Sequence, residues 1–317
     1  MKVLFVSSGN NKQGVGNVVK NQGDSLETHP EITLLSYYTI KGRGIRGYLS
    51  NVIPLYKHLK NNEYNIIHAH YSLSALVVTL VSTRKLIVSL MGSDVYAKGV
   101  YRFIIRLFSN FLWKATIVKS KEMQIKLMLP NAVTIPNGVD LSRFEYIEKT
   151  TAQLMTGFDK SKTNIVFLAD PNRREKNVIL AEHAIKLLED SNTALHIIYD
   201  IPHKNIREFL YAADILILTS LWEGSPNIIK EAMACNCPIV STDVGDVKWL
   251  FGNTEGCYLT SFDPEDVAEK IRSALEFAAS KGRTNGRERM IELGLDADTV
   301  SQKLVMVYKN VLKDAKQ

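Results

Sequence analysis

Residues Thr219–Gly245 read TSLWEGSPNIIKEAMACNCPIVSTDVG, and this stretch passes from a strand through a turn and a helix to a second strand. The apolar run Ile215–Thr219 suits a strand buried on both faces of a parallel sheet. Ser225 is a good helix N-cap and Pro226 suits a first helical turn, so the two predict where the helix starts. A second apolar run follows at Pro238–Ser241. The stretch therefore predicts one β–α–β unit of a doubly wound fold.

The turn in this unit has the chemistry of an anion site. Gly224 permits close approach of a ligand to the backbone, and the first turn of the helix offers free N–H groups to a phosphate. Glu223 lies in the turn, and Glu231 lies about two turns into the helix, roughly 8 Å from its start at ~1.5 Å per residue. Because carboxylates accept hydrogen bonds from paired hydroxyls, sugar and ribose are natural ligands for them.

The same alternation of short strands and amphipathic helices runs along the whole chain, which predicts the α/β class. A chain of 317 residues exceeds what one core usually fills. We expect two Rossmann-like doubly wound domains facing each other across a cleft, where the carboxyl ends of their strands meet ligands. The expected domains are 1–145 and 146–295, with a polar linker at 150–162. The final helix, 296–317, is expected to pack back on the first domain.

Charge is distributed unevenly between the two halves. Residues 1–150 hold 19 Lys and Arg against 9 Asp and Glu, a net of +10, whereas residues 151–317 hold 20 against 24, a net of −4. The first half therefore favours an anionic partner. No apolar stretch approaches 18 residues and the N-terminal apolar run is short for a signal peptide, so we expect a cytoplasmic chain.

The string EGSPNIIKEAMACNCPIVSTDVG, with its two glutamates separated by seven residues, resembles the signature of the retaining family-four (group 1) glycosyltransferases, which have the GT-B fold. The resemblance implies that Glu223 contacts the transferred sugar and that Glu231 contacts the ribose of a nucleotide-sugar donor. It also implies that backbone in this turn holds the distal phosphate and the sugar hydroxyls, at Gly224, Ser225, Pro226, Asn227 and Ile228.

A basic loop, PNRREKN, lies where this family binds the donor diphosphate. Lys176 matches the family's lysine. The usual arginine is displaced, so either Arg173 or Arg174 must substitute for it, and the sequence leaves open which. Fixed cations there would stabilise the negative charge that builds up as a nucleoside diphosphate leaves.

In the first half, Gly14 and Gly16 lie in a loop that the resemblance places near the donor phosphate or the acceptor. Val19 stands where a dinucleotide fingerprint has a third glycine, which disfavours a nicotinamide-dependent enzyme. His70 and Asp94 follow predicted strands at the same sheet edge and are candidate substrate contacts. Their alternatives are a structural role for His70 and helix capping by Asp94. The family commonly has a donor-contacting histidine at the position of Met91.

The resemblance implies transfer of a hexose-type sugar with retention of configuration, from a nucleotide sugar to a glycan or lipid-linked acceptor in the synthesis of a cell-surface polysaccharide. No residue stands out as a covalent nucleophile, so we favour front-face transfer. No cofactor and no metal ion are expected, since Asp296 and Asp298 suit the start of a helix. Nucleic acid is not an expected partner. The alternatives are an inactive or partner GT-B protein, or a nucleotide-sugar epimerase of the same fold.

A basic, aromatic stretch in the first half predicts peripheral binding to an anionic membrane, on the inner face. The alternative is an ordinary core-packed helix with solvated charges. The stretch, with the basic loop before it, contains Arg43, Arg46, Lys98, Arg102, Phe103, Arg106, Phe108, Phe111, Trp113 and Lys114.

Overall fold

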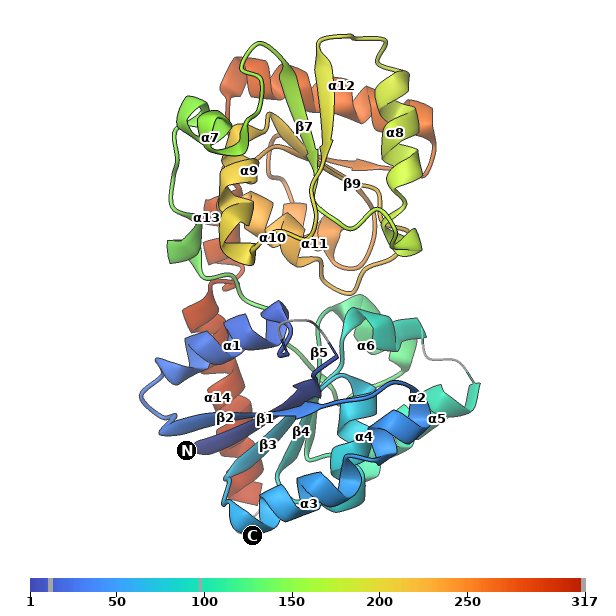
Figure 1. The fold of residues 1–317 in the computed structure, drawn as a ribbon, viewed down its shortest axis with the longest axis vertical. Coiled ribbons are helices and arrows are strands. Elements are labelled where there is room, and N and C mark those ends of the chain that lie inside the picture. The colour runs from blue at the N-terminus through green and yellow to red at the C-terminus, as the bar shows by residue number, and fades with distance from the viewer. Residues whose placement is uncertain (11–13, 97–98, 315–317) are drawn as a thin grey trace. The chain divides into compact units, whose positions relative to one another are not determined.

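The computed structural model describes residues 1–10, 14–96 and 99–314, which form two compact α/β units (Figure 1). The first unit comprises residues 1–138 and the segment that begins at Ala297, and the second comprises residues 139–296. Each unit is a parallel sheet with helices packed on it. The predicted α/β class with two Rossmann-like domains is therefore confirmed.

The first unit contains a six-stranded sheet in the order β2-β1-β3-β4-β5-β6, and all of its pairings are parallel. The strand order reverses between β1 and β3, which makes their carboxyl ends the switch point of this sheet. The strands are β1 (Lys2–Ser8), β2 (Leu34–Ile40), β3 (Ile66–His70), β4 (Leu86–Ser89), β5 (Ala115–Val118) and β6 (Val133–Thr134). The helices are α1 (Asn17–Glu27), α2 (Gly44–Leu49), α3 (Val52–Asn61), α4 (Ser72–Val81), the 3-10 helix η1 (Gly92–Tyr96), α5 (Gly99–Phe111), α6 (Lys121–Leu127) and α14 (Ala297–Asp314).

The last helix, α14, completes the core of the first unit. Leu304 and Tyr308 of α14 are fully buried in one cluster with Val3 and Phe5 of β1. The Tyr308 hydroxyl also lies 2.7 Å from Nδ1 of His68, a buried histidine in β3. The helix therefore contributes both apolar contacts and a buried hydrogen bond to the unit that holds the start of the chain.

The second unit contains a five-stranded parallel sheet in the order β11-β10-β9-β7-β8. Here the strand order reverses between β7 and β9. The strands are β7 (Thr163–Phe167), β8 (Thr193–Ile197), β9 (Ile215–Leu218), β10 (Ile239–Thr242) and β11 (Cys257–Thr260). The helices are η2 (Leu141–Phe144), α7 (Lys149–Thr156), η3 (Arg174–Lys176), α8 (Val178–Lys186), η4 (His203–Asn205), α9 (Ile206–Ala212), α10 (Asn227–Ala234), α11 (Val247–Phe251), α12 (Pro264–Lys281) and α13 (Gly286–Glu292).

The predicted linker at 150–162 is wrong, because residues 150–156 belong to helix α7 and residues 157–162 form the turn that leads into β7. Glu148 caps this helix, since its carboxylate accepts a hydrogen bond from Thr151 N at 2.9 Å. Ala152 on α7 is completely buried in the core of the second unit. The segment is polar because one face of a short surface helix is solvated, not because it connects two domains.

The structure divides the units after Gly138, earlier than the boundary expected at 145. Val139 already belongs to the second unit, because it pairs with Asp296 and its N–H donates to Leu295 O at 2.9 Å. The chain therefore enters and leaves the second unit through two adjacent segments.

Candidate functional site

Two loops meet at the switch point of the second unit, where β7 and β9 lie side by side. Leu221 N donates to Glu175 O at 2.8 Å, and the Thr219 hydroxyl donates to Asn177 O at 2.9 Å. These bonds fix the loop after β9 against the loop after β7. Open α/β sheets bind their ligands at the carboxyl ends of strands beside such a reversal. The loops therefore form the candidate site.

Each loop contributes one charged side chain to this site. The Lys176 ammonium, from the loop after β7, forms an ion pair with Oε1 of Glu223, from the loop after β9. The Ser220 hydroxyl donates to the same oxygen at 2.9 Å. The side chains of Lys176 and Glu223 are 12% and 16% exposed, so the pair is shielded from bulk water but still reachable by a ligand. Both groups can exchange their contact for a charged or hydroxylated ligand.

Helix α10 begins directly after this loop and holds the second glutamate. Glu231 is 7% exposed in its side chain, and His203 Nε2 donates a hydrogen bond to its Oε1 at 2.7 Å. His203 belongs to η4, which follows β8. The hydrogen bond to the Glu231 carboxylate raises the pKa of His203 above its usual value, against the opposing effect of burial.

We expect His203→Gln to make the second unit's stability less dependent on pH. Because the folded pKa of His203 is raised, its contribution is fully present below about 6.5, the unfolded value, and is lost as the pH rises through the folded pKa. The substitution should cost about 1–2 kcal/mol of unfolding free energy at pH 6 and less at pH 8.5. Urea unfolding at several pH values measures this difference, and a cost that does not change with pH would contradict the assignment.

A buried lysine supports the start of α10 from within the unit. Lys230 is completely buried, and its ammonium donates to the Ser225 hydroxyl at 3.1 Å. Burial lowers the pKa of Lys230 to about 8, while the nearby carboxylates of Asp246 and Glu231 act in the opposite direction. Asp246 itself is buried after β10. Lys230 therefore interacts both with Ser225, in the loop after β9, and with Asp246, in the loop after β10.

The backbones of these two loops also touch. Gly245 has φ +62°, and a Cβ atom there would lie 2.9 Å from Gly224 O and 3.1 Å from Glu223 O. A side chain at residue 245 would therefore be strained by its own conformation and would push directly on the backbone of the candidate site.

We predict that Gly245→Ala weakens ligand binding at this loop about tenfold and lowers unfolding free energy by roughly 1–3 kcal/mol. Gly252→Ala is the matched control. It has the same kind of backbone, with φ +52°, but its added Cβ would meet the movable Arg289 guanidinium at 2.9 Å. Titration of both variants with nucleotide ligands separates the effect of backbone strain from the effect of contact with the loop after β9. Equal weakening in both variants would show that general strain, not contact with the loop, is responsible.

The start of α10 differs from the sequence prediction. Ser225 is not the N-cap: Pro226 occupies that position, with no side-chain capping bond, and the helix begins at Asn227. The Ser225 hydroxyl accepts from Lys230 instead. The first turn of α10 therefore consists of Asn227 and the residues that follow it.

The two arginines of the basic loop, between which the sequence did not decide, differ in their contacts. Arg173 is 55% exposed and pairs with Glu175, at 2.6 Å between Nη2 and Oε1. Arg174 begins η3 and is exposed. Lys176 is thus the cation of this loop that the structure brings against Glu223, while both arginines project from the same loop.

In the first unit, the predicted residues lie at the carboxyl edge of the sheet but differ in accessibility. Gly16 is the N-cap of α1, and Gly14 has φ +77° with open space around its Cα. His70, at the end of β3, is 1% exposed, and neither ring nitrogen has a hydrogen-bond partner among the residues that the structure describes. Its ring stacks on His68 with centroids 4.3 Å apart. In this structure His70 therefore contacts protein atoms.

Asp94 caps a helix in the structure. The helix is α4, which comes before Asp94 in the sequence and not after it. The Asp94 carboxylate accepts hydrogen bonds from Ser72 N at 3.3 Å, from the Ser72 hydroxyl, and from Met91 N at 2.7 Å. Ser72 is the first residue of α4. Burial raises the pKa of Asp94 to about 6, although these bonds oppose the shift. The residue thus holds the segment after β4 against the start of α4.

Sequence reasoning missed His203, Lys230 and Asp246. Nothing in the string around His203 marks it, because its partner Glu231 is 28 positions away. For Lys230 the signal is weak, because three of the eight residues of α10 are polar and the helix does not stand out as fully apolar. In the structure all residues from Ile229 to Ala234 are buried.

Comparison with known proteins agrees with this geometry. Residues 176–276 match the family described as glycosyl transferases group 1, and the matched segment contains Lys176, Glu223 and Glu231. This segment is therefore similar to the group 1 glycosyltransferases. The chain as a whole has the GT-B fold.

One relative of this chain is a Bacillus subtilis protein named as teichuronic acid biosynthesis glycosyltransferase TuaC. It is 29% identical over 239 residues, which are 65% of this chain and 60% of TuaC. The chain therefore spans less than two thirds of that relative.

Two solved structures share the fold. Sucrose-phosphate synthase from Thermosynechococcus elongatus superposes with a TM-score of 0.82 at 14% identity, over 99% of this chain and 100% of that protein. Anabaena HepE, solved in complex with UDP and glucose, has a TM-score of 0.77 at 14% identity, over 98% and 99% of the two chains.

Proposed function

We propose that the protein transfers a sugar from a nucleoside-diphosphate sugar to an acceptor, and that the donor binds at the switch point between β7 and β9. The observation that carries this proposal is the Lys176–Glu223 ion pair beside the start of α10, with Glu231 two turns into that helix. The cation and the helix N–H groups suit a diphosphate. The two carboxylates suit hydroxyls, Glu223 for the transferred sugar and Glu231 for the ribose.

Transfer with retention is proposed to proceed on one face of the sugar. The bond from the anomeric carbon to the diphosphate oxygen breaks, the acceptor oxygen bonds to the same face of that carbon, and the acceptor proton passes to the leaving phosphate. Lys176, with Arg173 or Arg174, and the positive end of α10 stabilise the negative charge that develops on the diphosphate. Glu223 then positions the sugar through a hydroxyl.

We also propose that transfer needs no cofactor or divalent ion, because these protein cations supply the charge that a metal would otherwise provide. Turnover should persist after treatment with a chelator. Loss of activity on chelation that returns with added Mg²⁺ or Mn²⁺ would contradict this part of the proposal.

The donor site is tested with a panel of nucleotide sugars in a thermal-shift assay on the full chain. We expect at least one of them to raise the melting temperature, and Glu231→Ala to abolish the shift. If no nucleotide sugar stabilises the protein at millimolar concentration, the alternative of an inactive or partner GT-B protein is favoured.

For the acceptor, we propose a glycan or lipid-linked intermediate of cell-surface polysaccharide synthesis. The name of the relative TuaC, which refers to teichuronic acid biosynthesis, supports this class. Incorporation of labelled sugar into a lipid-extractable product, compared with a free oligosaccharide product, tests the choice between the two acceptor forms.

An exposed apolar face on the first unit supports access to a lipid-linked acceptor. Val100, Phe103, Leu107 and Phe111 recur at helical spacing along α5 and are 75%, 61%, 40% and 76% exposed. Ile45 of α2 is 79% exposed. Tyr48 of α2 and Tyr101 of α5 pack, partly buried, against the same core cluster of the first unit. Exposed or partly exposed cations occur on α2 and α5 or next to them in the sequence, namely Arg43, Arg46, Arg102, Arg106 and Lys114.

Two aromatic residues assigned to this surface from the sequence are not part of it. Trp113 is 5% exposed, and Phe108 packs partly buried against the same core. Lys98 lies outside the described residues. Among residues 1–10, 14–96 and 99–314, no helix is long and apolar enough to span a membrane.

We propose that the exposed face of α5 and α2 lies on an anionic membrane surface, with each nearby cation contributing about 1 kcal/mol of attraction. Vesicle flotation tests this: binding to anionic vesicles should be lost in Phe103→Ser combined with Phe111→Ser. Equal behaviour on anionic and neutral vesicles would contradict the proposal.

A further inference from the structure

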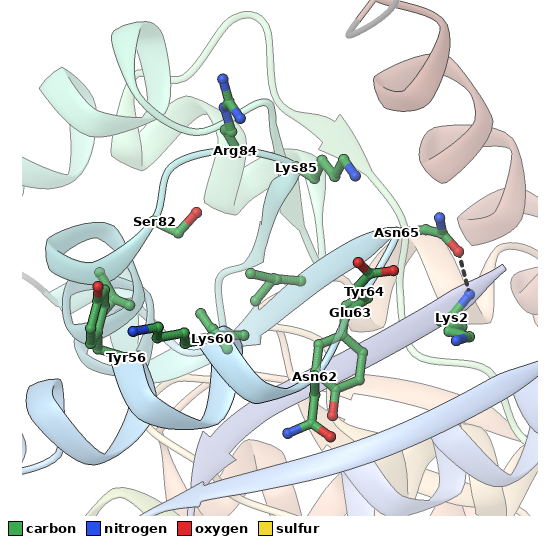
Figure 2. Close-up of a pocket in the computed structure, with 13 residues that line it drawn as sticks. Lys2, Tyr56, Lys60, Asn62, Glu63, Tyr64, Asn65, Ser82, Arg84 and Lys85 are labelled. Atoms are coloured by element: carbon green, nitrogen blue, oxygen red, sulfur yellow. Dashed lines mark hydrogen bonds between the residues drawn. The ribbon is translucent and has the colours of Figure 1, made fainter.

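A pocket of about 680 Å³ lies in the first unit, at the edge of the sheet where its strands begin (Figure 2). Lys2 starts β1, the segment 62–65 leads into β3, and the segment 82–85 leads into β4. Because the sheet is parallel, this edge is opposite the one that holds His70 and the glycine loop. The pocket is therefore distinct from both carboxyl-edge regions described above. Its volume is within the range of small-molecule sites.

Four cations line this pocket against one carboxylate, Glu63. They are Lys2, Lys60, Arg84 and Lys85. Within the part of the chain that the structure describes, no ion pair involves any of their side chains, although many other charges are paired. A concave surface lined by charge of one sign concentrates the field inside it and attracts ions of opposite sign. The pocket is consequently suited to an anionic ligand.

The rest of the lining is suited to a sugar. Leu59, Ile67 and Val81 provide apolar surface, and Tyr56 and Tyr64 provide aromatic rings. Tyr64 is held in place, since its hydroxyl lies 3.0 Å from His58 Nε2 and the two rings stack. Tyr56 is 55% exposed and free to contact a ligand face. Amide and hydroxyl groups that can pair with sugar hydroxyls are present on Asn62, Asn65 and Ser82.

Figure 2 shows how these groups are arranged. Arg84 and Lys85 lie on one side of the pocket, on the segment before β4, and Tyr56 and Lys60 lie on the other, on α3. Ser82 lies between the two sides. A ligand that spans the pocket would meet cations at both ends and an aromatic ring at one of them. A bare phosphate ion would fill only a small part of this space.

We propose that this pocket binds an anionic saccharide. Its phosphate or carboxylate groups contact Arg84, Lys85 and Lys60, and its ring lies against Tyr56. Such a ligand has two possible sources: a free sugar phosphate, or acidic residues within a glycan chain. The proposal rests on the pocket's charges and shape and does not depend on the transferase activity.

The experiment is calorimetric titration of the full chain with four probes: glucose 6-phosphate, a short oligogalacturonate, a neutral malto-oligosaccharide of the same length, and a single-stranded oligonucleotide. The test variant is Arg84→Gln combined with Lys85→Gln, which removes two charges and keeps similar side-chain size. The control is Lys57→Gln, an exposed lysine on α3 that does not line the pocket. Glu231→Ala separates this pocket from the donor site.

We expect an anionic saccharide to bind, with affinity that falls as salt rises and is roughly tenfold weaker in the double variant. Lys57→Gln and Glu231→Ala should leave this affinity unchanged. Tighter binding of the oligogalacturonate indicates a glycan chain, and tighter binding of glucose 6-phosphate indicates a free sugar phosphate; either supports the proposal. Equal binding of the neutral oligosaccharide or of the oligonucleotide, no binding of either acid, or an unaffected double variant would overturn it.

Discussion

Lys176→Ala is expected to lower kcat/KM for sugar transfer by about 10²–10³-fold, because it removes the cation nearest the proposed diphosphate. The loss should fall mainly on kcat, since charge on the diphosphate grows as the bond to the sugar breaks. The side chain is partly buried and lies against Glu223, so its charge is only weakly screened by solvent. Steady-state kinetics with varied donor concentration separates the effects on kcat and KM.

Lys162→Ala is the matched control for this prediction. Lys162 is an exposed lysine just before β7 in the same unit, and its removal should leave turnover unchanged. Glu223→Gln tests the other member of the pair, because it keeps the shape of the side chain but removes the charge that holds Lys176. Activity of Lys176→Ala close to that of the unmodified protein would exclude this lysine from the donor site.

Lys230→Ala is expected to destabilise the protein by about 3–5 kcal/mol, the cost of removing one member of a buried charge group. The ammonium is completely buried, so its loss leaves Ser225 without its donor and removes the positive charge that interacts with Asp246 and Glu231. Denaturant unfolding monitored by fluorescence measures this. Donor binding should weaken as well, because Ser225 and Gly224 form part of the proposed phosphate loop.

Lys230→Met distinguishes charge from packing, because it fills nearly the same space without the ammonium. If the charge of Lys230 is responsible, Lys230→Met should lose nearly as much unfolding free energy as Lys230→Ala. If the side chain only fills volume, Lys230→Met should lose little. The pH dependence gives a second check. The folded pKa of about 8 is below the unfolded value of 10.5, so the protein should gain stability relative to Lys230→Met as pH rises between these values. A parallel pH dependence of the two proteins would contradict the assignment.

The sequence was sufficient to place the two glutamates of the candidate site because they occur in one contiguous string. Glu223 and Glu231 are fixed relative to each other by a strand, a turn and a helix, and each of these has a local signal. The partners of those glutamates were less predictable. Lys176 reaches Glu223 only because the sheet places β7 beside β9, and His203 reaches Glu231 from the segment after β8.

Two local predictions failed for a common physical reason: a polar residue was interpreted by its own preference and not by its neighbours. Ser225 prefers an N-cap, but a buried ammonium from Lys230 takes its hydroxyl as an acceptor. The polar segment at 150–162 has the composition of a linker, but Glu148 caps it and Ala152 is buried in the core of the second unit. In both cases the structure depends on contacts with other residues, and the composition of the segment itself does not show these contacts.

The place of α14 in the first unit has a consequence for how the protein is made. Residues 139–296 leave the ribosome as one continuous piece, whereas residues 1–138 must wait for α14 before Val3 and Phe5 are covered. The second unit, although later in the sequence, is therefore the first that can complete its core during synthesis. Until then, this face of β1 lacks the cover that Leu304 and Tyr308 provide, so premature termination before α14 would leave a folded second unit joined to an unfinished first one.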